Sequence, residues 1–249
     1  MTKRTLIHPT AIIGDEVELE AGVAVGPHTS IFGPVVVGEG AFIGPGVRIG
    51  SPPEIATLPQ HPAWTRSATY EGVVIGPRAV IRDNVVIHQG SHRPTRIGAD
   101  SWILTGAYLA HDVEVGDQAT VSAGVSIGGH AQLGPRSNIG MNATIHQRRL
   151  VGPGAMIGMG TPLTRDAPPF SKVFGAPPRI RGINRRSLDH YGLDEDAIEQ
   201  LIATYEKGGS LEQLSVHHSW SAHREALDWW IQREPLRPLE VLDSSRHDG

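Results

Sequence analysis

Residues 97–140 read IGADSWILTGAYLAHDVEVGDQATVSAGVSIGGHAQLGPRSNIG, with an aliphatic residue at every sixth position. The same spacing covers residues 7–49 and 75–87, and it continues through residues 139–163. A helix repeats every 3.6 residues and a plain strand alternates every two, so neither produces a strict period of six. The pattern predicts a solenoid of hexapeptide repeats, in which short strands alternate with turns.

Each repeat is expected to point its aliphatic side chain inward and to turn at glycine or proline. The spacing resembles the left-handed parallel β-helix family, in which three hexads form one triangular coil. We therefore expect an all-β solenoid plus α-structure: a left-handed parallel β-helix over residues 1–186, with loop 51–72 projecting from a corner, and a helical domain over 187–249. Members of that family commonly pack as trimers through their flat faces, so the resemblance also implies a homotrimer.

Composition narrows the class of protein. Only 5% of the 249 residues are aromatic, whereas there are 30 glycines and 19 prolines, as a core of small aliphatics with many turns requires. The chain has no cysteine, which excludes disulfides, thiolate metal sites and a cysteine nucleophile. No apolar run is long enough for a signal peptide or a membrane span, so we expect a soluble cytoplasmic protein.

Charge is distributed unevenly along the chain. Residues 148–186 contain eight basic residues against the single acid Asp166, although the whole chain has a formal charge of −4. Such a patch suits an anionic partner, either a phosphate, coenzyme A or an acidic carrier protein, and it is equally compatible with a solvated basic face. Few aromatics are interleaved with these arginines, so nucleic acid is not expected as a partner.

The sequence pattern changes at Ser187, where the period of six is lost. Asp194 is placed to cap a helix that ends near Lys207, and Ser210 with Gln213 has capping-box spacing for another. A third helix is predicted over residues 221–233. Its apolar side chains would come from Leu227, Trp229, Trp230 and Ile231, which we expect to serve packing.

Stacking the hexads in coils of eighteen places several polar residues at one edge of the prism. Asp112 falls one coil below His130, and His111 falls one coil below Gly129, about 4.8 Å apart along the axis. His146 and Gln147 lie one coil further on. A histidine can accept a proton from an alcohol, a carboxylate can orient it, and a glycine amide can stabilise an oxyanion, as acyl transfer from a thioester requires. Corner histidines and aspartates can equally serve only to cap backbone groups.

The stretches AYLAHDVEVG, SIGGH, ATIHQ and RDAPPF, followed by FGAPPRIRGINRRSLDHYGLDEDAI, resemble the UDP-N-acetylglucosamine O-acyltransferase family of lipid A synthesis. The resemblance implies that His111 is the general base, Asp112 its orienting partner and Gly129 the source of an oxyanion-hole amide. It also implies an acyl carrier protein thioester as donor, with a coenzyme A thioester as the alternative, and no further cofactor. Positions that match substrate-contacting residues of the family are His88, His130, His146, Gln147 and Asn184.

The chain departs from the family at several matched positions. Tyr108 stands where relatives carry a histidine, and Arg186 and His190 replace a glutamate and an arginine. The family's charged Asp-Leu-Lys-Tyr stretch has no counterpart in loop 51–72, so the identity of the acceptor sugar stays open. Met159 matches a position that governs acyl-chain length, where methionine accompanies shorter chains. The family's acyl group is an (R)-3-hydroxyacyl chain, and we expect a medium or short acyl group here.

Three other functions are compatible with a hexapeptide prism. One is N-acylation of a nucleotide-linked amino sugar by an acyl coenzyme A. Another is a zinc site of the γ-carbonic anhydrase kind, but only His88 and His92 have close histidine spacing, so no metal site is expected. The third is a scaffold that binds partners without catalysis.

Overall fold

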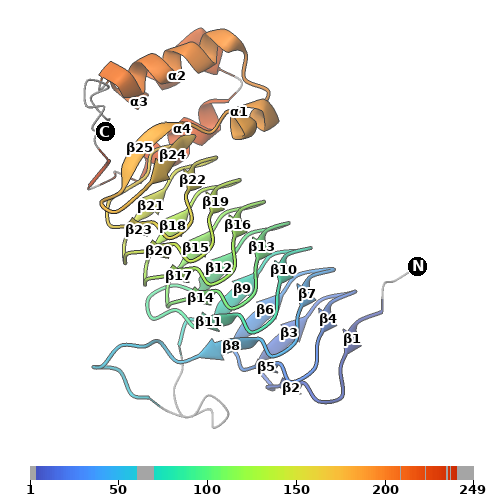
Figure 1. The fold of residues 1–249 in the computed structure, drawn as a ribbon. Helices are drawn as coiled ribbons and strands as arrows, with labels where there is room; N and C mark the ends of the chain where they lie inside the picture. The colour runs from blue at the N-terminus through green and yellow to red at the C-terminus, as the bar shows by residue number, and fades with distance from the viewer. Residues whose placement is uncertain are drawn as a thin grey trace.

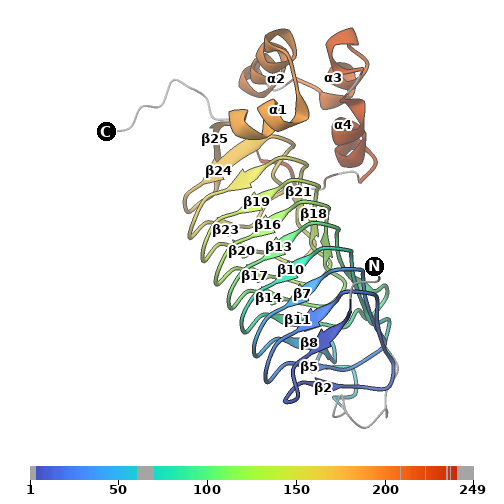
Figure 2. The ribbon, with the colours of Figure 1, turned by 90° about the vertical axis from the view of Figure 1, so that its right-hand side faces the viewer.

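The computed structural model describes residues 4–60, 70–207, 209–221, 223–233, 235 and 237–239. Within them the chain winds into a long triangular prism of three parallel sheets, and helices cover the C-terminal end (Figure 1). Figure 2 shows the coils stacked along the prism. The prediction of a parallel β-helix followed by helical structure is confirmed.

Each of the three sheets forms one wall of the prism. Sheet A contains β1 (Leu6–Ile7), β4 (Ala24–Val25), β7 (Phe42–Ile43), β10 (Val80–Ile81), β13 (Trp102–Ile103), β16 (Thr120–Val121), β19 (Asn138–Ile139), β22 (Met156–Ile157), β24 (Ser171–Phe174) and β25 (Arg179–Ile183). Sheet B contains β2 (Ile12–Ile13), β5 (Ser30–Ile31), β8 (Arg48–Ser51), β11 (Val86–His88), β14 (Tyr108–Leu109), β17 (Ser126–Ile127), β20 (Thr144–Ile145) and β23 (Pro162–Leu163). Sheet C contains β3 (Val17–Leu19), β6 (Val35–Val37), β9 (Val73–Ile75), β12 (Thr95–Ile97), β15 (Glu114–Val115), β18 (Gln132–Leu133) and β21 (Leu150–Val151).

The period of six follows from the inward side chain of each strand. Leu109 pairs with Ile127, which is its equivalent one coil on, and both are fully buried. Stacked aliphatic side chains of this kind fill the interior and supply most of the stability of a solenoid. Ile7 was expected inside, yet it is 47% exposed, because it belongs to the first coil, which has no coil beneath it.

Two interruptions change the number of residues in a coil. Ile49 pairs with Ile87 across the inserted loop 51–72, of which residues 61–69, including Trp64, lie outside the described residues. The second interruption, Gly90–Pro94, lies between β11 and β12. The first interruption follows β8 and the second follows β11, and these two strands pair with each other, so the loop residues lie at neighbouring coils of the same corner.

The prism ends in a hairpin of β24 and β25, whose strands are antiparallel. The helices that follow are α1 (Arg185–Tyr191), α2 (Glu195–Lys207), α3 (Leu211–Ser215), the short η1 (His218–Trp220) and α4 (Arg224–Ile231). They enclose a second core around Phe170 and Trp220, whose ring centroids are 6.0 Å apart. The predicted packing role therefore holds for Trp230, which is 4% exposed, and Trp220, which the prediction did not name, is fully buried in the same core.

Two helix predictions agree with the structure and one was wrong in its bounds. Asp194 accepts a hydrogen bond from the Ala197 amide before α2, and Ser210 caps α3. The helix predicted over 221–233 begins only at Arg224 and ends at Ile231, since a separate turn, η1, precedes it. The domain boundary at residue 186 stays a prediction; Leu239, far beyond it, packs in the solenoid core.

Candidate functional site

The polar edge predicted from the stacking lies at the corner between sheets B and C. Here Asp112, His130 and Arg148 occupy equivalent positions of successive coils, each in the left-handed region with φ of 60–61°. The His130 amide donates to the His111 carbonyl at 3.0 Å, and the Arg148 amide donates to the Gly129 carbonyl at 2.9 Å. The predicted stacking of His111 under Gly129 and of Asp112 under His130 is confirmed.

His111 and Asp112 form a close pair. Nδ1 of His111 lies 2.6 Å from Oδ2 of Asp112, whose side chain is fully buried. This contact places the imidazole proton on Nδ1, because an ionised carboxylate can only accept. Nε2 is then left with its lone pair, the form that a general base needs.

Asp112 is held from below by the interruption Gly90–Pro94. The amides of Ser91, His92 and Arg93 donate to its carboxylate at 2.8–3.1 Å, and the Ser91 hydroxyl donates to Oδ2 at 2.7 Å. Burial by itself raises the pKa of Asp112, but the hydrogen bonds from Ser91, His111 and these amides outweigh it and hold the pKa well below its usual range. Asp112 is therefore a permanent anion beside the base.

Gly129 lies against the ring of His111. A Cβ at this position would fall 2.6 Å from Cε1 and 2.7 Å from Nε2 of His111, closer than atoms can approach. Glycine is therefore required here for the imidazole to occupy its position. Among the described residues no acceptor is recorded for the Gly129 amide, so its N–H is available beside Nε2.

His130 and His92 continue the cluster on the other side of Asp112. The rings of His111 and His130 meet edge to face at 5.0 Å, and those of His92 and His130 at 5.6 Å. Burial lowers the pKa of His130; Asp112 opposes this shift, whereas Arg148, His111 and Arg93 add to it. His130 is therefore held in its neutral form.

The structure brings together one set of metal-ligating side chains that the sequence did not indicate. Ligand atoms of His92, Asp112 and His130 lie within 4.8 Å of one another. The Asp112 carboxylate already accepts hydrogen bonds at both oxygens, and the arginines Arg93 and Arg148 disfavour a cation nearby. The arrangement thus fits a carboxylate that orients histidines better than a metal ligand.

A second polar group lies on the sheet B side of the corner. His88 and Tyr108 meet edge to face at 5.4 Å, and the Tyr108 hydroxyl donates to Glu54 at 2.5 Å. His88 is buried, with Nδ1 2.6 Å from the Pro52 carbonyl. Burial, and then the bond to Glu54, raise the pKa of Tyr108, so its hydroxyl keeps its proton.

The remaining predicted site residues lie away from His111 within one chain. His146 and Gln147 are exposed at the corner above Gly129, where Nδ1 of His146 lies 3.1 Å from the Gln147 carbonyl. Asn184 precedes α1 and donates to the Gly154 carbonyl at 2.9 Å. The others, all exposed and without a recorded contact to His111 among the described residues, are Met159, Arg186 and His190.

Sequence reasoning missed the residues that come from the two interruptions. Glu54 belongs to the first, and Ser91 and Arg93 belong to the second. The Arg93 guanidinium donates to the Asp112 carbonyl at 3.0 Å and lies 3.0 Å from Glu114. Their only signal was the loss of register itself, since a solenoid that breaks its repeat does so where function requires other residues.

Comparison with known proteins finds acyltransferases among the relatives of this chain. Residues 94–129 match the family model described as bacterial transferase hexapeptide (six repeats). The acyl-(acyl-carrier-protein)–UDP-N-acetylglucosamine O-acyltransferase of Caulobacter vibrioides is 36% identical over 94% of this chain and 97% of its own, and that of Saccharophagus degradans is 40% identical over 84% and 87%. The solved UDP-N-acetylglucosamine acyltransferase of Campylobacter jejuni is 25% identical, with a TM-score of 0.69, over 95% of this chain and 99% of its own.

Proposed function

Because the chain belongs to the acyl-(acyl-carrier-protein)–UDP-N-acetylglucosamine O-acyltransferase family, we propose that it moves an acyl chain from an acyl carrier protein thioester to a hydroxyl of UDP-N-acetylglucosamine. The observation that carries the proposal is the contact of 2.6 Å between His111 and Asp112, with the Gly129 amide beside the free imidazole nitrogen. These groups supply a base, an orienting anion and an oxyanion donor in one place.

The reaction follows from these positions. Nε2 of His111 accepts the proton of the sugar hydroxyl while the hydroxyl oxygen attacks the carbonyl carbon of the thioester. The carbonyl oxygen becomes an oxyanion that accepts a hydrogen bond from the Gly129 amide. The intermediate collapses, the carbon–sulfur bond breaks, and the departing thiolate takes the proton from His111. Asp112 stabilises the imidazolium throughout and returns the ring to its starting tautomer.

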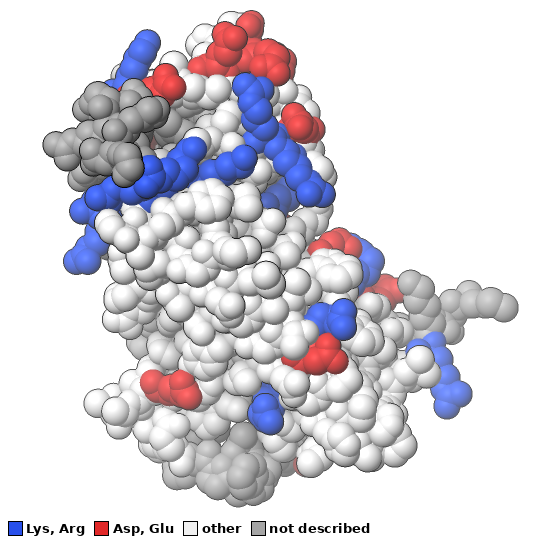
Figure 3. All heavy atoms as spheres, viewed as in Figure 1, with Lys and Arg blue, Asp and Glu red and all other residues white. Residues whose placement is uncertain are grey.

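An acidic carrier protein would meet a basic surface at the C-terminal end of the prism. Figure 3 shows Lys and Arg side chains gathered in a band across this end, over the region of β24 and β25. The sequence places Lys172, Arg179 and Arg181 on these strands and Arg185 and Arg186 on α1. Charge of this sign steers an anionic partner toward the prism and orients it on arrival.

We further propose that three copies assemble so that neighbours complete each site. The outer face of sheet A exposes Leu6, Phe42 and Trp102 at 61%, 41% and 48%, which is unusual for a wall left in water. Asn184, Arg186 and His190 do not contact His111 in one chain, as expected if they serve a neighbour's site. Met159, which is 70% exposed, would then limit the acyl chain to a short or medium length.

The proposed chemistry uses only the His111 and Asp112 side chains, the Gly129 amide and the two substrates, so we propose that no cofactor takes part. No helix in the described part of the chain is long and apolar enough to cross a membrane. A cysteine-free chain agrees with a reducing compartment, and we propose the cytoplasm as the place of action.

The test is release of thiol from acyl carrier protein and coenzyme A thioesters of several chain lengths, with products identified by mass spectrometry. Acceptors would include UDP-N-acetylglucosamine, other nucleotide sugars and an amino sugar nucleotide. We expect the O-acylated nucleotide sugar as product and at least a 100-fold loss of turnover in His111→Ala, the usual range for a general base. Absence of thiol release with every donor and acceptor would contradict the proposal. An N-acylated product would show that the chain is an N-acyltransferase instead.

A further inference from the structure

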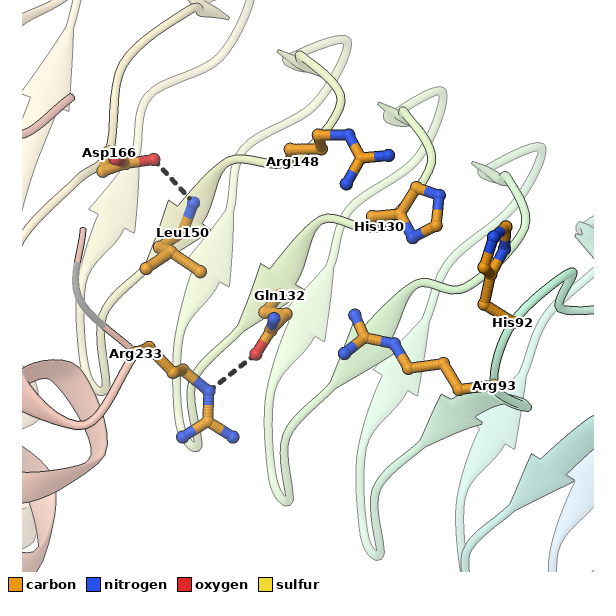
Figure 4. A pocket seen from close by; sticks show the side chains of 8 residues that line it. All are labelled: His92, Arg93, His130, Gln132, Arg148, Leu150, Asp166 and Arg233. Atoms are coloured by element: carbon orange, nitrogen blue, oxygen red, sulfur yellow. Dashed lines mark hydrogen bonds between the residues drawn. The ribbon is translucent and has the colours of Figure 1, made fainter. Parts of the chain in front are cut away.

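A pocket of about 550 Å³ lies on the outer face of sheet C, beside the corner that carries His130. Figure 4 shows its arrangement: Arg148 and His130 come from successive corner turns, Arg93 reaches in from the interruption below, and Arg233 reaches in from the end of α4. Four segments that are distant in sequence thus direct basic side chains toward one space. The mechanism above assigns none of the three arginines to a substrate.

The charges around this pocket do not cancel. Glu114 lies 3.0 Å from Arg93 and 3.9 Å from Arg233, so one carboxylate serves two guanidinium groups. Asp166 also lines the pocket, but Arg149 lies 3.2 Å from it and neutralises it. For the Arg148 guanidinium no ion pair or hydrogen bond is recorded with any described residue. Among the described residues that line the pocket and the carboxylates paired with them, three arginines therefore share one carboxylate, Glu114, which leaves a net charge of about +2.

Two of the three arginines, Arg93 and Arg233, are held in place before any ligand arrives. Nε and Nη2 of Arg93 donate to the Asp112 carbonyl at 3.2 and 3.0 Å. Nε of Arg233 donates to the Gln132 side chain at 2.6 Å, and its guanidinium lies 4.0 Å from the centroid of the Trp229 ring. Preorganised guanidinium groups lose little side-chain entropy on binding, which favours a strong site for a multivalent anion.

We propose that this pocket binds the phosphate group of a phosphate ester, with Arg93, Arg148 and Arg233 as its donors. A phosphoryl group offers several oxygens and up to two negative charges, and planar guanidinium groups bind it through paired hydrogen bonds. His92 and His130, at the rim, add donors. A metal cation at the same rim would lie among three arginines, so an anion is the ligand that the charges select.

The proposal deepens the proposed function, on which the choice of ligand rests. A nucleotide sugar carries a diphosphate, and both acyl carrier protein and coenzyme A carry a phosphate on the pantetheine arm. The His130 ring meets that of His111 at 5.0 Å, so the pocket begins one side chain away from the base. Either substrate could therefore place its phosphate here while its reacting group faces Nε2 of His111.

The first experiment measures binding of inorganic pyrophosphate to the full chain by calorimetry, without turnover. Arg148→Gln removes an exposed side chain that supports no recorded contact, so folding is expected to be unaffected. We expect at least tenfold weaker pyrophosphate binding in this variant and in Arg233→Gln, with affinity falling as salt rises. Arg82→Gln is the matched control, because Arg82 is exposed at another corner, paired with Asp83, and should bind like the wild type.

A competition arm then identifies the source of the phosphate. Displacement of pyrophosphate by UDP but not by coenzyme A assigns the pocket to the acceptor, and the reverse result assigns it to the donor. If neither UDP nor coenzyme A displaces pyrophosphate, the result supports a site for other, free phosphate esters. Pyrophosphate binding that is absent, or equal in wild type, Arg148→Gln and Arg233→Gln, overturns the proposal. Arginine-dependent binding in a protein that transfers no acyl group would sink the proposed function alone.

Discussion

The carboxylate of Asp112 lies 2.6 Å from Nδ1 of His111 and 3.7 Å from Nε2 of His130, so one buried anion faces two imidazoles. Only His111 is within hydrogen-bonding distance. Asp112 therefore fixes the tautomer of one histidine and acts on the other through its charge alone. His111 and His130 lie in successive coils, and it is their different contact with Asp112 that distinguishes the base from its neighbour.

Replacing Asp112 with Asn tests the orienting role. The amide has nearly the same shape, but its NH₂ group can donate to Nδ1 and so favour the wrong tautomer of His111. We expect kcat to fall by about 100-fold with a smaller change in KM, measured by thiol release under saturating donor. A variant within a few-fold of wild-type turnover would show that Asp112 supports the fold and not the base.

The same substitution predicts a change in acid stability. The folded-state pKa of Asp112 is lowered, so its contribution to stability is complete above the unfolded value of about 3.9 and is lost as pH falls through the folded value. The difference in unfolding free energy between wild type and Asp112→Asn should therefore be largest near neutral pH and shrink in acid. Urea unfolding at about pH 7 and about pH 3 measures it; a difference that grows in acid contradicts the assignment.

Gly129→Ala should damage catalysis without damaging the fold. The added methyl group would meet the His111 ring at 2.6 Å, and the exposed side of the ring lets it move aside. We expect a loss of turnover of about tenfold or more, with a melting temperature close to that of the wild type. Gly14→Ala serves as the control, since its Cβ would make only ordinary contacts at 3.4 Å. Equal activity in the two variants would show that the ring does not need its observed position.

Ser91→Ala removes the hydroxyl that donates to Oδ2 of Asp112. A hydrogen bond to a buried charged group contributes about 1.5–3 kcal/mol, so we expect a loss of stability of about that size by denaturant unfolding. Turnover should fall as well, because Oδ2 is also the acceptor for His111, and Ser91→Thr should restore both. Failure of threonine to restore turnover, with stability recovered, would separate Ser91 from the base.

Met159→Gly tests the proposed limit on chain length. The side chain is 70% exposed in one chain, so its removal should change stability by less than about 0.5 kcal/mol. We expect the variant to prefer longer acyl chains than the wild type does. The measurement is a competition between donors of several chain lengths, with the products quantified by mass spectrometry. An unchanged chain-length preference would mean that another residue limits the length of the acyl chain.

The sequence predicted the parts of this molecule that repeat. A strict period of six predicted the short strands, and the resemblance to β-helices with three hexads in a coil then predicted the three sheets and the stacking of Asp112 under His130, because backbone geometry is the same in every coil. It could not predict Glu54 or Ser91, since both come from interruptions whose conformations depend on tertiary contacts. The start of α4 was misplaced for a different, local reason: capping by His217 forms a separate turn before the helix.

The equivalent positions Asp112, His130 and Arg148 have one backbone conformation and three different charges. Over two coils, roughly 10 Å, the corner passes from an anion through a neutral imidazole to a cation. A ligand lying along this edge experiences an electrical gradient parallel to the prism axis. In the proposed phosphate site, this gradient would draw the phosphate of a substrate toward the helical end and leave its uncharged hydroxyl near the base. The charges of three equivalent corner residues would thus favour one orientation of a substrate along the prism axis. That preference does not depend on a contact of matching shape.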